Sequence, residues 1–238
     1  MHILNDQPQR AEALAVALLL SATGGFLDIY SYLYRGHVFA NAVTGNIVLF
    51  GLNLAEGDLP ACGRYLLAIC AYAGGVFTAC LINARFSAND RHYWHQAVLG
   101  CEIAILVMVA FLPCGKLDFI ANAAISFICA MQVQAFRHVR GLPFASTMCT
   151  GNLRSGSELL FKAVQSHSAA DLCKALHYYG VIAVFILGAL AGAILLRTYG
   201  TGMFLATPAA LLAAAVLIVN RRQRLWLRRH FRRRSHGR

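Results

Sequence analysis

Long runs of apolar residues, separated by short polar stretches, are the main pattern along this chain. A helix needs roughly 20 mostly apolar residues to cross a bilayer. Stretches close to that length predict membrane-spanning helices at residues 11–33, 65–84, 95–113, 117–136, 176–196 and 203–220. Two shorter runs, residues 47–54 and 153–164, predict short helices. The pattern therefore predicts an all-α, polytopic membrane protein with about six transmembrane helices and two short broken or re-entrant helices.

Each short run follows a copy of one repeated motif. The first copy, residues 35–46, reads RGHVFANAVTGN, and the second, residues 140–152, reads RGLPFASTMCTGN. A repeat unit of about half the chain indicates a duplicated membrane unit rather than a solenoid. We therefore predict a single transmembrane domain over residues 1–220, with repeat halves at about residues 11–113 and 117–220.

The distribution of basic residues bears on whether the short helices span the membrane. Six spans would give inverted halves, and eight spans would give parallel halves. Basic residues in short loops favour the cytoplasmic side. With six spans and both termini cytoplasmic, 17 of the 21 Lys and Arg residues lie inside. Eight spans would move four of these residues outside, so the six-span, inverted arrangement is preferred. It resembles transporters in which broken helices meet from opposite faces.

Composition supports a membrane protein. Hydrophobic residues make up 58% of the chain and charged residues only 13%, whereas a soluble domain has about 25% charged residues. The net charge is +11, but nine of the basic residues lie in positions 221–238. A basic segment beside the last membrane helix is typical of a topology signal. We therefore interpret residues 221–238 as a basic cytoplasmic tail and expect no nucleic-acid partner.

The chain lacks the sequence patterns of metal sites and of common enzymes. None of its eight cysteines forms Cys-x-x-Cys, and no His-Glu-x-x-His pattern occurs. A Ser/His/Asp set and a glycine-rich nucleotide loop are also missing from the sequence. We therefore expect no metal, no cofactor and no enzymatic activity.

Two carboxylates, Asp28 and Glu102, lie well inside predicted spans. A charged residue at the bilayer centre costs about 2.5–3.5 kcal/mol on insertion scales, so such residues are candidates for function. Asp28 precedes the first repeat copy by a short loop and is the stronger candidate, while Glu102 is interpreted as lying near the cytoplasmic interface. The hypothesis is that Asp28 couples transport to protons or binds a cationic solute. The alternative is that Asp28 caps the broken helix or pairs with Arg35.

The Thr-Gly-Asn segments of the two copies each precede a predicted helix. A helix N-terminus offers unpaired N–H groups and the positive end of a dipole, which suits a polar or anionic ligand. Close helix packing by Gly and Thr is the alternative explanation of these segments. Under the duplication, Asp28 corresponds to Gln132. The predicted substrate-binding residues are therefore Asp28, Thr44, Gly45, Asn46, Gln132, Thr150, Gly151 and Asn152. Arg35 and Arg140 either attract an anion or extend to the lipid headgroups.

Several of these residues also carry a resemblance to a known family. They are Gly25-Phe26-Leu27-Asp28, Thr44-Gly45-Asn46, Ala130-Met131-Gln132 and Thr150-Gly151-Asn152. On these residues the sequence resembles the YoaK family of bacterial multi-pass membrane proteins, which is defined by a domain of unknown function. The resemblance covers essentially the whole chain. It implies a multi-pass membrane protein and supplies no substrate or activity.

Two functions remain open at this point. The first is a small-solute transporter of the cell membrane, with a midplane site at the two Thr-Gly-Asn turns and a small polar or ionic solute as its ligand. The second is a non-transporting membrane interaction or assembly protein whose glycine-rich helices, such as the one with Gly188-x-x-x-Gly192, pack against partners. The lipid bilayer is a partner in both cases, and the oligomeric state is left open.

Overall fold

The computed structural model describes residues 14–85, 91–139 and 142–218. The predicted tail, the first thirteen residues and Arg140 lie outside the described residues. The elements are α1 (Leu14–Tyr34), α2 (Val43–Glu56), α3 (Leu59–Asn83), α4 (Arg91–Ala110), α5 (Asp118–Ala135), β1 (His138–Val139), β2 (Leu142–Pro143), α6 (Cys149–Ser166), α7 (Ala169–Tyr199), the 3-10 helix η3 (Thr201–Leu205) and α8 (Ala206–Ile218). The two strands form one short antiparallel pair.

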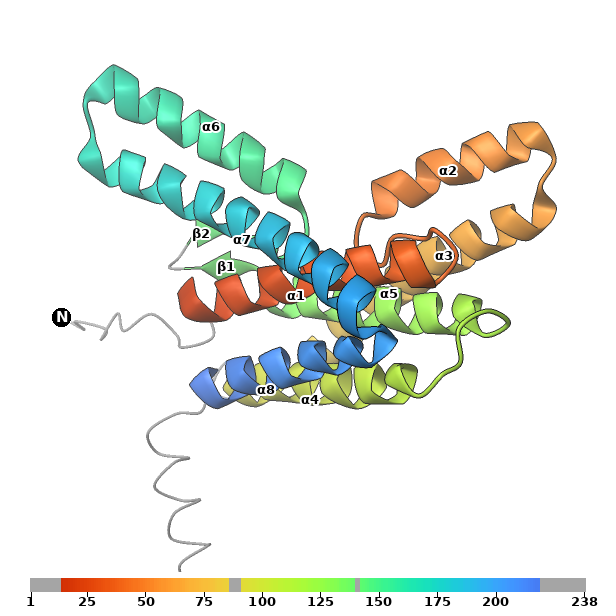
Figure 1. Cartoon of the computed structure of the whole chain (residues 1–238). Helices are drawn as coiled ribbons and strands as arrows, with labels where there is room; N and C mark the ends of the chain where they lie inside the picture. The colour runs from red at the N-terminus through yellow and green to blue at the C-terminus, as the bar shows by residue number, and fades with distance from the viewer. Residues whose placement is uncertain (1–13, 86–90, 140–141, 219–238) are drawn as a thin grey trace, which may run out of the picture.

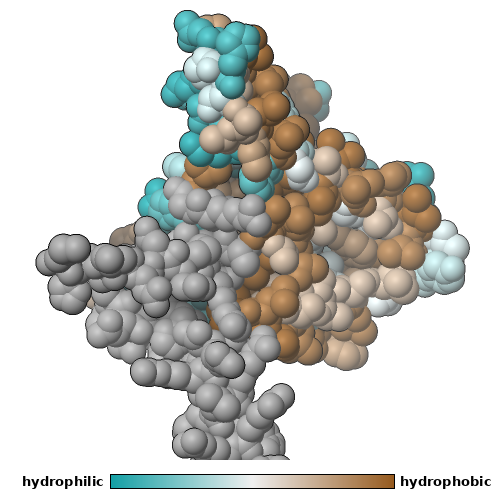
Figure 2. All heavy atoms as spheres, turned by 90° about the vertical axis from the view of Figure 1, so that its left-hand side faces the viewer, coloured by the Kyte–Doolittle hydropathy of each residue, from teal (hydrophilic) through white to brown (hydrophobic). Residues whose placement is uncertain are grey.

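The predicted class, an all-α polytopic membrane protein, is confirmed. Within the described residues, α1, α3, α5, α7 and the continuous segment Thr201–Ile218 are long and apolar enough to cross a membrane, and Trp94–Ala110 of α4 is slightly shorter. These segments correspond to the six predicted spans. Figure 2 shows a broad hydrophobic surface, with hydrophilic residues gathered at the upper tip where α6 turns into α7. The large side chains of Phe77 and Phe111 are exposed on the outside of the bundle, where lipid would cover them.

Both short helices begin earlier than the sequence predicted. The predicted starts were residues 47 and 153, but α2 begins at Val43 and α6 at Cys149. The Thr-Gly-Asn segments therefore form the first turn of each helix rather than the chain before it. The N–H group of Asn46 donates to the Ala42 carbonyl oxygen, and that of Asn152 donates to Met148. Thr, Gly and Asn are typical of loops, but here backbone hydrogen bonds make them part of the helices.

The long helices after the short ones also begin earlier than predicted. Helix α3 begins at Leu59 rather than residue 65, and α7 at Ala169 rather than residue 176. Side-chain caps explain both starts: Asp58 accepts from the Ala61 N–H and Ser168 accepts from the Asp171 N–H. Pro60 and Arg64 near the start of α3, and Asp171 and Lys174 near the start of α7, interrupt the apolar runs and hide these starts.

The helix pairings follow the predicted duplication. Helix α1 packs along α7, and its counterpart α5 packs along α3. Helix α2 lies on α3 as α6 lies on α7, and α8 lies on α1 as α4 lies on α5. The last helices of the two halves, α4 and α8, pack against each other. Each contact between two helices is therefore matched by a contact between the equivalent helices of the other half.

The short helices both start near the middle of the molecule and run toward opposite ends (Figure 1). Helix α2 has 14 residues and is about 21 Å long, which is less than the roughly 30 Å hydrocarbon core. Helix α6 has 18 residues and carries the exposed ion pair Arg154–Glu158. Each helix ends at a residue in the left-handed region, Gly57 and His167 respectively, and the chain then turns back along α3 or α7.

Glycines bring the backbones of α1 and α7 into direct contact. A Cβ atom on Gly25 would lie 2.1 Å from the Phe185 carbonyl oxygen, and one on Gly188 would lie 2.1 Å from the Ala22 carbonyl oxygen. The other half repeats this approach, since a Cβ atom on Gly75 of α3 would lie 2.2 Å from the carbonyl oxygen of a residue of α5. The Gly-x-x-x-Gly segment is thus a close-packing surface as predicted, and its partner is α1 of the same chain.

Candidate functional site

The loops that carry the two repeat copies meet on one turn of α1. We name residues 35–42 loop 1 and residues 142–148 loop 2. Asn41 of loop 1 donates from Nδ2 to the Gly24 carbonyl oxygen at 3.2 Å. Thr147 of loop 2 packs against the same residue, because its Cγ2 atom lies 2.6 Å from the position that a Gly24 Cβ would take. Two segments more than 100 residues apart are therefore brought together at Gly24.

Asp28 fixes loop 1 to α1. Its side chain is 7% exposed, and Oδ1 accepts the Asn41 N–H at 2.7 Å. One turn later, Ser31 Oγ accepts the Ala40 N–H at 3.1 Å. This geometry agrees with the alternative in which Asp28 secures the broken helix. The suggested pairing of Asp28 with Arg35 is wrong, because Arg35 pairs with another carboxylate.

Gln132 makes the corresponding contact with loop 2. Its Oε1 accepts from Ser146 Oγ at 2.9 Å, and its Nε2 donates to both oxygens of Glu102 at 2.9 and 3.1 Å. Ser146 follows Phe-Ala in the second copy as Asn41 does in the first, so the two contacts occupy matching positions. Glu102 is 0% exposed. Glu102 thus lies inside the protein, and its position near the cytoplasmic interface stays a prediction.

The two carboxylates belong to one polar region. Asn41, which is bonded to Asp28, and Thr147, which follows the Ser146 bonded to Gln132, both contact Gly24. We name the set Asp28, Asn41, Glu102, Gln132, Ser146 and Thr147 the polar centre. Its members come from α1, α4, α5 and both loops, and they include two acidic and no basic side chains.

The asparagines of the two Thr-Gly-Asn segments bond to the backbone of their own loops and do not join the polar centre. Asn46 accepts the Phe39 N–H at 3.0 Å and donates to the Phe39 carbonyl oxygen at 2.7 Å. Asn152 pairs in the same way with Ala145, at 3.4 and 2.7 Å. Both amides span seven residues and are buried. Each Asn therefore locks its loop to the first turn of its short helix.

The other predicted site residues stay outside the polar centre. Thr44, Thr150 and Gly151 are exposed on the first turns of α2 and α6. Gly45 packs against the Phe39 ring, which lies 3.1 Å from the position of a Cβ atom. Of the eight predicted residues, the structure brings only Asp28 and Gln132 into the polar centre.

Sequence reasoning did not select Asn41, Ser146 and Thr147. They lie in the spacer where the two copies differ, so a comparison of identical residues passes over them. Asn41 and Ser146 each follow Phe-Ala, and this shared position could have identified both from the sequence.

Each loop is also held by a tyrosine from the long helix that follows it. Tyr65 of α3 donates to the His37 carbonyl oxygen at 3.5 Å, and Tyr178 of α7 donates to the Pro143 carbonyl oxygen at 2.6 Å. Both tyrosines are buried, and each lies ten residues before the glycine that contacts the opposing helix. The two loops are thus held in matching ways, as the predicted repeat leads one to expect.

The hydrogen bonds that Asn46 and Asn152 make to their loops lead to a first prediction. Changing Asn46 or Asn152 to Asp keeps the shape of the side chain but removes the donor to the buried carbonyl oxygen. We expect each change to cost about 1–3 kcal/mol, the penalty for an unsatisfied buried group, as a lower unfolding midpoint of the purified protein. The control is Asn53→Asp, because Asn53 makes only a local bond to Leu49 within α2. Midpoints equal to that control would contradict the locking role.

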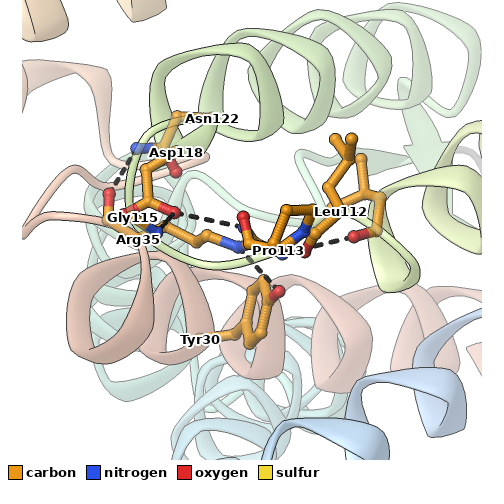
Figure 3. Close-up of polar contacts among 8 residues, drawn as sticks. Tyr30, Arg35, Leu112, Pro113, Gly115, Asp118 and Asn122 are labelled. Atoms are coloured by element: carbon orange, nitrogen blue, oxygen red, sulfur yellow. Dashed lines mark hydrogen bonds and ion pairs between the residues drawn. The ribbon is translucent and has the colours of Figure 1, made fainter.

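Arg35 is buried and holds the connection between α4 and α5 (Figure 3). Its side chain is 1% exposed and pairs with Asp118 at 3.1 Å. Nε donates to the Tyr30 hydroxyl at 2.8 Å, and the Arg35 carbonyl oxygen accepts from Asn122 at 2.6 Å. The remaining guanidinium bonds go to the carbonyl oxygens of Val109, Leu112 and Pro113. Both interpretations of Arg35, headgroup contact and anion capture, are therefore wrong, since its donors are already used.

Comparison with known proteins places the chain in a family. Residues 16–218 match the family described as "Protein of unknown function (DUF1275)". The chain belongs to this family. It is also 30% identical over 147 residues to the "UPF0700 transmembrane protein YoaK" of Bacillus subtilis (strain 168), an alignment covering 58% of this chain and 62% of that protein. No solved structure matches the chain. The resemblance of this DUF1275 member to YoaK is confirmed.

Proposed function

We propose that the protein is a small-solute transporter of the cell membrane and that the polar centre is its site. The observation that carries this proposal is the meeting of both loops at Gly24, each tied to a buried carboxylate. Loop 1 is tied through Asp28, and loop 2 through Gln132 and Glu102. Buried ionisable groups in a membrane are costly and mark solute or ion pathways.

The proposal treats the two halves as an inverted repeat. The exchanged helix pairings and the opposite directions of α2 and α6 support this arrangement. With cytoplasmic termini, loop 1 enters from outside and loop 2 from the cytoplasm. In transporters of this kind, one half moves against the other around a fixed midplane site. The exposed residues Thr44, Thr150 and Gly151 then line the two approaches to the site.

Tight contacts at Gly24 define what must move. Because Thr147 lies against Gly24 and Asn41 is bonded to it, a solute reaches the polar centre only when one loop separates from α1. Loop 1 and loop 2 are therefore the two gates of the proposed mechanism. The assembly alternative is weaker, because the Gly188 surface that would bind a partner is already covered by α1.

The experiment that tests transport uses a solute panel. Purified protein is screened for thermal stabilisation by amino acids, sugars, amines, carboxylates and nucleosides, and any hit is assayed for counterflow in proteoliposomes. A bound solute at 100 times its Kd stabilises by about 2.7 kcal/mol. We expect Gln132→Ala to lose the response. The control is Gln134→Ala, since Gln134 on the same helix contacts Cys80 of α3 instead. Transport is contradicted if no solute stabilises the protein, or if both variants respond alike.

A further inference from the structure

Two buried oxygen atoms on the residues that contact Gly24 have no hydrogen-bond partner among the described residues. They are Asn41 Oδ1 and Thr147 Oγ1, from loop 1 and loop 2 respectively. Their side chains are 4% and 6% exposed. The orientation of the Asn41 amide is fixed, because its nitrogen must face the Gly24 carbonyl oxygen. The free atom is therefore an oxygen in both cases.

Two more unpartnered oxygens follow the duplication. Ser21 Oγ on α1 and Ser126 Oγ on α5 are fully buried without a described partner, and they lie 105 residues apart, as Phe39 and Phe144 do. Ser21, Gly24 and Asp28 are spaced to share one face of α1. Buried hydroxyls without partners are unfavourable, so a ligand or a water molecule would satisfy these oxygens.

The charge of the polar centre selects the kind of ligand. Asp28 and Glu102 carry two negative charges when ionised. The polar centre itself contains no basic side chain, which leaves a net negative charge. Arg35 does not neutralise it, because its guanidinium is engaged with Asp118 and the α4–α5 connection. A cation would satisfy the free oxygens and balance the ionised carboxylates together, whereas water would satisfy only the oxygens.

We propose that Asn41 Oδ1 and Thr147 Oγ1, together with the Asp28 carboxylate, bind a monovalent alkali cation between the two loops at Gly24. Oxygen ligands suit hard cations, whereas transition metals prefer nitrogen and sulfur. In the described part of the chain, no group of three or more His, Cys, Asp or Glu side chains is arranged to hold a metal ion. One carboxylate with neutral oxygens therefore fits a monovalent rather than a divalent ion.

The cation bridges the two gates, since each loop supplies one of its neutral ligands. Its role as a coupling ion rests on the proposed transport function, but its binding can be measured alone. Bound cation would hold both loops against α1, and its departure would free either loop to separate.

The test is the melting temperature of the purified full-length protein in NaCl, KCl or LiCl, with choline chloride keeping the ionic strength constant. We expect one alkali cation to raise the melting temperature saturably. Thr147→Val removes the free oxygen at nearly constant shape and should weaken the apparent affinity roughly tenfold or more. The control is Thr23→Val, because Thr23 Oγ1 is bonded within α1 to Leu19, and its cation response should persist.

The outcomes separate the cation site from transport. Equal melting temperatures of the parent protein in all salts would overturn the cation site, as would an unchanged affinity in Thr147→Val. If this happens while a panel solute still undergoes counterflow, transport stands without the ion. A cation response that Thr147→Val loses supports the site even where no solute is transported, and in that case the transport proposal fails.

Discussion

Replacing Gly25 or Gly188 with alanine is expected to prevent stable assembly of the bundle. Each new Cβ atom would lie 2.1 Å from a backbone oxygen of the opposing helix, and backbone atoms cannot move aside as a flexible side chain can. The helices must separate, and the contact between α1 and α7 is lost along their length. We expect a loss of at least about 3 kcal/mol, the upper end of usual overpacking costs. The measurement is the yield of monodisperse protein and its unfolding midpoint.

A matched glycine on the same helix serves as the control. Gly180 of α7 has no atom within 4 Å of its hypothetical Cβ, so Gly180→Ala meets no obstacle. Alanine favours helix over glycine by about 0.5–1 kcal/mol, and this variant should be unchanged or slightly more stable. If Gly25→Ala and Gly180→Ala behave alike, the close approach of α1 and α7 is contradicted.

Replacing Arg35 with methionine is expected to cost about 3–5 kcal/mol, as removal of one partner from a buried ion pair does. The change leaves Asp118 without its cation and three carbonyl oxygens without their donor (Figure 3). Arg35→Lys should also lower the unfolding midpoint, because an ammonium group lacks the planar, five-donor guanidinium that reaches these acceptors. The measurement is again the unfolding midpoint in detergent.

The exposed arginine of α6 provides the comparison for Arg35. Arg154 pairs with Glu158, but its side chain is 82% exposed, and exposed ion pairs contribute little. Arg154→Met should therefore leave the midpoint nearly unchanged. A small effect of Arg35→Met, similar to that of Arg154→Met, would show that the Arg35 cluster does not hold the α4–α5 connection.

The order of the helices could be predicted from sequence because apolar runs mark membrane spans directly. Helix starts could not be predicted, since Asp58 and Ser168 cap first turns in which Pro60 or Asp171 interrupts the apolar run. The repeat pointed to the loops that meet, and the matching of Asp28 with Gln132 agrees with their contacts to the loops. The predicted solute-binding role of these two residues stays a prediction.

Contacts between residues far apart in the chain explain why the surroundings of some residues could not be predicted from the sequence. Arg35 has a charged side chain near a helix end, which suggests exposure, but all its acceptors except Tyr30 lie 74 to 83 residues away. Glu102 could not be placed at the polar centre because hydropathy does not indicate which neighbour a helix face meets. The Thr-Gly-Asn asparagines resemble ligand groups in sequence, but local loop geometry uses both ends of each amide.

The central claim, that two broken helices meet from opposite membrane faces, is tested most directly by cysteine labelling. Ala42 and Met148 are the N-cap residues of α2 and α6, and both are exposed. Each is changed to cysteine in a variant whose eight native cysteines are replaced, and an impermeant maleimide is added to right-side-out or inside-out vesicles. The account predicts that Ala42→Cys reacts from the outside only and Met148→Cys from the cytoplasmic side only. Reaction of both from the same side would contradict it.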